Sequence, residues 1–369
     1  MTDTTDNTST IRSEIARNIG VLTLNRPKAL NSLSLEMIRA LTSALLAWRA
    51  DPAVHAVVIR SASEKAFCAG GDIRFFYDAG RATPAEGSAS LEDFFTEEYA
   101  LNHLIHHYPK PYIALMDGVV MGGGMGIAQS GVANQLRIVT ERTKMAMPEV
   151  NIGLFPDVGG SYFLPRAPGQ IGNYLGLTGE TIGAADAIYA GLADIYIPSA
   201  QIPALNALLS HPGSTDLRQT IRNFAAPFQT EIELGNSTLA LQRALIDRHF
   251  SLASVTAIVT SLATDSNPFA QKIVATLQKR SPLMMCVTLE LLKRGAKLGV
   301  ADCLRLERSL VRRCFEHKEI LEGVRALVID KDNAPRWDPA QLADVTEELV
   351  ASFFAPPWPE HAHPLRALD

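Results

Sequence analysis

The feature that most constrains the fold is an alternation of short apolar runs with stretches of helical period. Residues 19–24 are rich in aliphatic side chains suited to a strand, which Pro27 would stop. After Ser34, a candidate helix cap, large apolar residues recur at helical spacing. These are Ile38, Leu41, Leu45 and Trp48. Residues 56–59 again suit a buried strand, so the unit is strand, helix, strand and loop, which predicts an α/β core.

Strand-like runs recur along the chain and then stop. They lie at residues 112–116, 135–139, 144–147 and 194–197. From Pro198 to residue 328 nearly every stretch has helical period. We therefore expect an α/β fold with a helical C-terminal region. The predicted division is a disordered leader over residues 1–12, a core over 13–198, a helical region over 199–355 and a loose tail over 356–369.

Composition narrows the classes of function. The 369 residues are 47% hydrophobic and 20% charged, which is ordinary for a globular protein. The net charge of −5, without a basic run among aromatic residues, argues against nucleic acid as a partner. Four scattered cysteines predict free thiols in a reducing compartment. The polar first dozen residues do not look like a targeting signal, and the longest apolar run, 112–128, is interrupted by Asp117 and glycines. We expect a soluble, cytoplasmic protein with no membrane partner.

Two carboxylates, Glu149 and Asp157, lie in a stretch otherwise dominated by apolar residues, proline and glycine. Burial raises the pKa of a carboxyl group, and two nearby carboxylates shift one another, so this pair is a candidate for acid, base or nucleophilic chemistry. The local residues equally allow a structural interpretation. In that case Glu149 caps the turn at residues 152–153 and Asp157 caps a helix that opens near Gly159.

Three motifs favour the chemical interpretation. They are residues 65–74 (KAFCAGGDIR), 117–126 (DGVVMGGGMG) and 155–160 (FPDVGG). Together they resemble the enoyl-CoA hydratase/isomerase (crotonase) superfamily, and the third, with residues 322–337, is similar to its 3-hydroxyisobutyryl-CoA hydrolase branch. The resemblance implies a crotonase-like spiral of ββα repeats followed by helices that cover the site and often mediate oligomerisation. A homo-oligomer is therefore possible.

Glycine-rich loops in this family stabilise the negative charge that gathers on a thioester oxygen under attack. Backbone N–H groups do this best, and backbone approaches closely only where side chains are missing. By resemblance, the N–H groups of Ala69 and Gly123 form the oxyanion hole, and Gly122 and Gly124 lie beside the substrate. Without the resemblance, the same glycines could simply make tight turns.

Gly126 separates the reactions within the family. Hydratases carry a glutamate at this place in the glycine loop, whereas here there is no side chain, and Asp157 stands where hydratases commonly have glycine. The resemblance thus implies that Glu149 attacks a thioester carbonyl or activates water, while Asp157 orients the substrate, positions water or handles protons. The implied reaction releases 3-hydroxyisobutyrate and CoA in valine breakdown. The alternatives are a hydratase or isomerase on the same fold, and a non-catalytic member that binds acyl-CoA or serves in assembly.

The substrate would be a small-molecule acyl-CoA, so no separate cofactor is expected. By resemblance, the CoA-binding residues are Lys28, Ala29, Leu30, Ala69, Gly70, Gly71, Asp72 and Ile73. Asp78 lies where the hydrolase branch tends to have an acidic residue that contacts the substrate, although a solvated helix charge is an equal interpretation. His103, His106 and His107 have helical spacing but no further ligand cluster, so we expect no metal site.

Overall fold

A computed structural model describes residues 9–83, 87–129, 135–210, 216–230, 232 and 236–369. The chain forms two compact units that interleave along the sequence. The first comprises residues 1–71, 101–145 and 182–240, and the second comprises residues 72–100, 146–181 and 241–369. Each unit therefore draws on both of the predicted regions, before and after residue 198.

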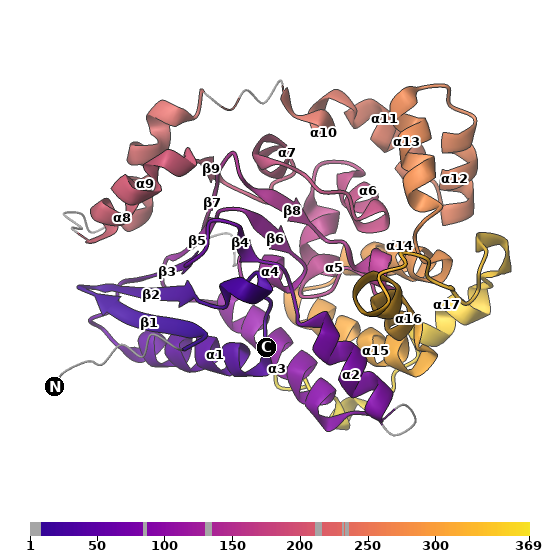
Figure 1. Cartoon of the computed structure of the whole chain (residues 1–369), viewed down its shortest axis with the longest axis horizontal. Helices are drawn as coiled ribbons and strands as arrows, with labels where there is room; N and C mark the ends of the chain where they lie inside the picture. The colour runs from indigo at the N-terminus through magenta and orange to yellow at the C-terminus, as the bar shows by residue number, and fades with distance from the viewer. Residues whose placement is uncertain (1–8, 84–86, 130–134, 211–215, 231, 233–235) are drawn as a thin grey trace. The chain divides into compact units, whose positions relative to one another are not determined.

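The first unit is built on a six-stranded sheet of order β1-β2-β3-β5-β7-β9 (Figure 1). Its strands are β1 (Ile11–Ala16), β2 (Ile19–Leu24), β3 (Ala56–Ser61), β5 (Tyr112–Met116), β7 (Gln135–Val139) and β9 (Ile195–Tyr196). All neighbours are parallel except β1 and β2. A three-stranded sheet of order β4-β6-β8 adds β4 (Ala66–Cys68), β6 (Val119–Met121) and β8 (Lys144–Ala146).

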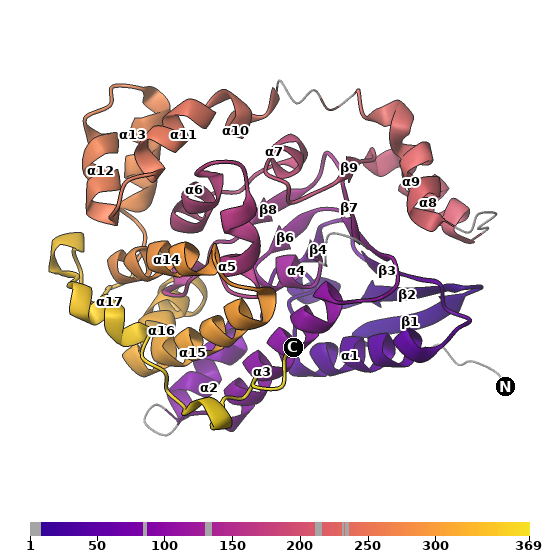
Figure 2. The same ribbon diagram turned by 180° about the vertical axis from the view of Figure 1, so that it is seen from behind.

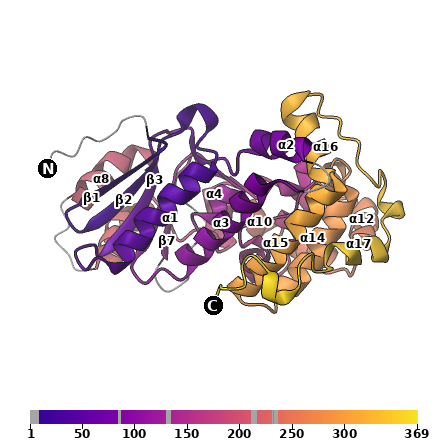
Figure 3. The ribbon, with the colours of Figure 1, turned by 90° about the horizontal axis from the view of Figure 1, so that it is seen from below.

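Helices cover the six-stranded sheet, and strands β2, β5 and β7 are buried at every position. Helix α1 (Leu35–Ala50) runs beside β1 and β2 (Figure 3), and it begins where the Ser34 side chain accepts a hydrogen bond from the Met37 N–H. Trp48 packs so closely on Gly20 that a Cβ there would come within 2.4 Å of the ring. Apolar residues of α8 (Ile202–Ser210) and α9 (Leu217–Ala225) share a core with Val21 and Val58 of the sheet. The first unit also contains the helices α4 (Gly123–Gly126) and α7 (Ala184–Tyr189).

The second unit is almost entirely helical. Its helices are α2 (Ile73–Ala82), the first part of α3 (Ala89–His106), α5 (Gly160–Phe163), α6 (Ile171–Thr178), α11 (Arg243–Phe250), α12 (Val255–Ala263), α13 (Pro268–Leu277), α14 (Pro282–Gly295), α15 (Val300–His317), α16 (Glu319–Val324) and α17 (Glu347–Phe353). The short α10 (Thr238–Leu241) lies where the two units meet in sequence. Figure 2 shows α14 and α15 beside α5, and the 3-10 turn η2 (Glu149–Ile152) packs on α16.

The two ends of the chain differ from the predicted division. Residues 1–8 of the predicted leader lie outside the described residues, whereas Ile11 and Arg12 already belong to β1. The C-terminal tail, predicted to be loose, makes specific contacts instead. Leu365 is only 3% exposed, and Arg305 donates a hydrogen bond to the Leu368 carbonyl at 2.7 Å. Among the helices of the described residues, none combines the length and hydropathy that crossing a bilayer requires.

Candidate active site

Two glycine turns of the first unit come close together at the ends of β4 and β6. The turn after β4 contains Gly70, whose φ is +100°, and the turn after β6 leads into α4 at Gly123. A Cβ on Gly70 would come within 3.2 Å of the Met121 carbonyl and 3.6 Å of the Gly123 nitrogen. Only glycine therefore combines this backbone conformation with this approach.

The donors at these turns differ from the predicted pair. The Ala69 N–H donates to the Leu30 carbonyl at 3.0 Å, which contradicts its predicted role as an oxyanion donor because the group is already engaged. Among the described residues, the N–H groups of Gly71 and Gly123 donate to no protein acceptor. Gly123 is the first residue of α4, where helical N–H groups lack partners. Gly71 and Gly123 are thus the donors that the two turns leave open.

The flanking glycines and the predicted CoA segment also lie in the first unit. Gly122 is the N-cap of α4, and Gly124 packs on β4, where a Cβ would come within 2.3 Å of the Cys68 carbonyl. The contact between Ala69 and Leu30 brings together the two predicted CoA-binding stretches, 28–30 and 69–71. Lys28 is exposed there. Asp72 and Ile73 begin the second unit, and the Asp72 carboxylate caps α2 by accepting from the Phe75 N–H. CoA binding by these residues stays a prediction.

The second unit holds the carboxylate pair. Glu149 begins η2 and is 5% exposed, and Asp157 is 4% exposed. Neither carboxylate caps the turn or helix that the structural interpretation assigned to it: η2 and α5 have no such side-chain cap. The Asp157 carboxylate instead accepts a hydrogen bond of 2.6 Å from Tyr99 Oη. Both acids are therefore buried, as predicted, and the Asp157 carboxylate is held by Tyr99 and not by local capping.

A third acid, Glu98, joins this pair from α3 and was missed in the sequence. It is 2% exposed and lies one residue before Tyr99. Among the described residues, Glu98 Oε1 and Glu149 Oε2 are buried without a hydrogen-bond partner. A signal was present: Glu98 continues the apolar helical face that contains Leu91, Phe94, Phe95 and Leu101. A carboxylate on such a face is rarely buried unless it is paired or has a functional role.

Asp78, the acid that the resemblance favoured for substrate contact, does not share this environment. It lies exposed on α2. This exposure agrees with the solvated interpretation, and substrate contact by Asp78 stays a prediction.

The pKa values of both predicted acids are raised. Burial, followed by the negative charge of Asp157, raises the pKa of Glu149 well above its ordinary value. Burial also raises the pKa of Asp157, to about 6, although the Tyr99 hydrogen bond opposes the rise. The negative charge of ionised Asp157 thus favours the protonated form of Glu149. Two neighbouring carboxyls with raised pKa values form a pair that can give and take protons.

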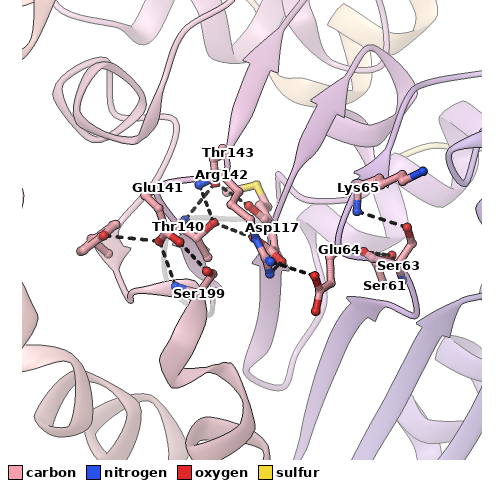
Figure 4. A network of polar contacts seen from close by, with 12 residues as sticks. Ser61, Ser63, Glu64, Lys65, Asp117, Thr140, Glu141, Arg142, Thr143 and Ser199 are labelled. Atoms are coloured by element: carbon pink, nitrogen blue, oxygen red, sulfur yellow. Dashed lines mark hydrogen bonds and ion pairs between the residues drawn. The ribbon is translucent and has the colours of Figure 1, made fainter.

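The first unit also contains a cavity of about 540 Å³ at the carboxyl ends of β2, β3 and β5. No predicted site residue lines this cavity. Figure 4 shows that Arg142 bonds both Asp117 and Glu64, and Asp117 also accepts from Thr140 Oγ1 at 2.6 Å. These charges compensate one another within the unit. We therefore assign the network to holding the loops at this end of the sheet.

Comparison with known proteins identifies the family. Residues 19–354 match the sequence model of the enoyl-CoA hydratase/isomerase family, so the chain belongs to that family. The fold agrees, since a carnitinyl-CoA dehydratase from Mycobacterium thermoresistibile matches with a TM-score of 0.86 and 39% identity over 95% of this chain and 98% of that one. An enoyl-CoA hydratase from Rhodobacter sphaeroides gives a TM-score of 0.83 and 38% identity over the same shares. The predicted crotonase fold is thereby confirmed.

Among curated relatives, the chain is similar to mitochondrial 3-hydroxyisobutyryl-CoA hydrolases. The protein of Gallus gallus is 40% identical, with 95% of this chain and 90% of the relative covered. The protein of Danio rerio is 42% identical, with shares of 91% and 87%, and that of Homo sapiens is 38% identical, with shares of 91% and 86%. The chain is therefore a crotonase-family acyl-CoA protein whose relatives include both hydrolases and hydratases.

Proposed function

We propose that this protein hydrolyses acyl-CoA thioesters, that its substrate is 3-hydroxyisobutyryl-CoA, for which its curated relatives are named, and that it acts in valine breakdown. The observation that carries the proposal is the buried pair of Glu149 and Asp157, combined with glycine at position 126. Hydration needs two carboxylates placed around one water, and the glycine loop supplies none. Sequence identity of about 40% to the hydrolases supports the same reaction.

In the proposed reaction, Glu149 acts on the thioester carbonyl, directly or through water. Direct attack would join a Glu149 oxygen to the acyl carbon, break the carbon–sulfur bond and release CoA as a thiolate that takes up a proton. Water would then hydrolyse the mixed anhydride. If Glu149 instead activates water, the water oxygen adds to the acyl carbon and CoA is then eliminated, which gives the free acid. In both routes the N–H groups of Gly71 and Gly123 stabilise the oxyanion, and Asp157 orients the substrate hydroxyl or the water.

Thiol release tests this proposal. The purified protein is incubated with 3-hydroxyisobutyryl-CoA and a thiol-reactive dye, and Glu149→Gln and Asp157→Asn are assayed in parallel. We expect free CoA from the wild type and a loss of at least about 100-fold in kcat for each variant. Variants that hydrolyse as fast as the wild type would refute the assignment of both acids.

A hydratase is the second candidate, because the two solved structures above are titled as a dehydratase and a hydratase. Crotonyl-CoA separates the two reactions. Loss of the enoyl absorbance without thiol release would establish hydration. Release of thiol from the hydroxyacyl substrate, with stable enoyl absorbance, would support hydrolysis. Failure of both reactions would favour a non-catalytic acyl-CoA-binding protein.

A further inference from the structure

Glu307 is a buried carboxylate that the proposed mechanism does not use, yet it contacts the chain directly after Asp157. It lies on α15 and is 0% exposed. Its Oε2 accepts from the Gly159 N–H at 2.8 Å, and its Oε1 accepts from the Ser161 N–H at 3.0 Å and from Ser161 Oγ at 2.5 Å. One side chain from a distant helix thus binds three donors of the turn that follows the proposed active-site acid.

The turn held by Glu307 has an unfavourable backbone conformation. Val158, between Asp157 and Gly159, has a φ of +51°, and β-branched residues rarely adopt this left-handed region. Such a conformation is unfavourable and persists only where surrounding contacts impose it. The contacts on Gly159 and Ser161 are in the right place to impose it, because they begin one residue after Val158.

The Asp157 side chain is held separately, from α3. Tyr99 Oη donates to its Oδ2 at 2.6 Å. The residue after Glu307 joins the same two helices, since Arg308 donates from Nε to Thr96 Oγ1 at 3.0 Å and from Nη2 to Glu92 Oε2 at 2.5 Å. Helices α3 and α15 therefore form one frame, in which α15 holds the main chain beyond Asp157 and α3 holds its carboxylate.

Capping of α5 alone does not account for a glutamate at this position. A serine or asparagine at the N-cap would satisfy the Ser161 N–H without burying a carboxylate, which costs free energy. Burial raises the pKa of Glu307 to about 8 in spite of the three donors. Burial of the Glu307 carboxylate therefore costs more free energy than capping of α5 requires.

From this geometry we infer that Glu307 is a positioning residue, which fixes the Asp157 carboxylate for thioester hydrolysis by holding the turn at residues 158–161. The inference rests on the proposed function. It requires that Glu307 act through Asp157 and not on the substrate.

A double-mutant comparison tests this dependence. Glu307→Gln, which removes one acceptor oxygen and retains the shape, should lower kcat by about 10- to 100-fold, as expected for a displaced active-site group, with little change in KM. In an Asp157→Asn background, the same change should lower the residual kcat by less than about threefold, because coupled residues are not additive. Equal losses in the two backgrounds would overturn the inference.

Glu319 provides a matched control in the same unit. It is 2% exposed and accepts from Ser281 Oγ at 2.6 Å, and among the described residues its carboxylate has no hydrogen bond to residues 157–161. Glu319→Gln should lower the melting temperature to a similar extent while leaving kcat within about threefold of the wild type. If both glutamine variants lower kcat equally, Glu307 has only a general structural role. Should Glu307→Gln fail to fold, Ser161→Ala removes one of the three donors and should show the same dependence on Asp157 with a smaller loss.

A crystal structure of Glu307→Gln separates this inference from the proposed function. If the wild type releases no CoA from any acyl-CoA, the proposed hydrolysis fails, but the positioning role remains measurable. A displaced Asp157, with its contact to Tyr99 lost, would support positioning. An unchanged contact of 2.6 Å would overturn it.

Discussion

At the scale of single residues, burial and the charge of Asp157 are the two largest effects that favour the protonated form of Glu149. Attack or base catalysis requires the ionised form, so the rate should rise with pH as Glu149 loses its proton. Asp157→Asn removes one of the two effects and should lower the pKa of Glu149. We therefore expect the acidic limb of the kcat/KM profile for the residual activity to move to lower pH.

The measurement is a pH profile of kcat/KM for both proteins. Asp302→Asn, on the exposed side of α15, is the control because its partner is Arg305 and not a site residue. Its profile should match that of the wild type. An acidic limb that stays in place, or moves upward, in Asp157→Asn would show that Glu149 is not the group that titrates.

Tyr99 gives a second prediction at this scale. Its hydroxyl stabilises ionised Asp157, so Tyr99→Phe should raise the pKa of Asp157 above about 6. A hydrogen bond to a charged group contributes roughly 1.5–3 kcal/mol, so kcat should fall by about 10- to 100-fold. Tyr108→Phe is a matched control, because Tyr108 is also buried but donates to the Leu45 carbonyl in the first unit. If both variants behave alike in kcat and pH profile, Tyr99 acts only through stability.

At the scale of elements, the glycine turn after β4 is the most constrained piece. Gly70→Ala adds a Cβ that meets the Met121 carbonyl at 3.2 Å, at a φ that alanine rarely adopts. We expect the turns that present Gly71 and Gly123 to separate, and kcat to fall by about 100-fold or more. Gly183→Ala is the control, since a Cβ there meets nothing within 4 Å. Comparable kcat values for the two variants would argue against these turns as the oxyanion site.

The elements also show how far the sequence could predict this molecule. Residues 19–24, 112–116 and 135–139 coincide with β2, β5 and β7, because buried parallel strands are rich in apolar residues. Strand β1 was missed since it is a partly exposed edge strand with a polar sequence. Local patterns also could not reveal Glu307, whose partners lie near residue 160, or the use of the Ala69 N–H by Leu30. Both depend on tertiary contacts that leave no periodic signal.

At the scale of the whole molecule, the buried carboxyls should make stability depend on pH. Burial raises the pKa of Asp157 to about 6, of Glu319 to about 7 and of Glu307 to about 8, whereas unfolded carboxyls titrate near pH 4. Between these values the folded chain binds more protons than the unfolded chain. The free energy of unfolding therefore falls as pH rises, on the order of 1 kcal/mol per pH unit for each such group.

The melting temperature should accordingly fall by roughly several degrees between pH 5 and pH 8. Because glutamine does not titrate, Glu307→Gln and Glu319→Gln should each be less sensitive to pH over this interval than the wild type, whatever their effect on the melting temperature itself. Scanning calorimetry from pH 5 to pH 8 measures the melting temperature and its dependence on pH. A melting temperature that rises toward pH 8, or variants with the same slope as the wild type, would mean that these carboxyls are ionised in the folded protein.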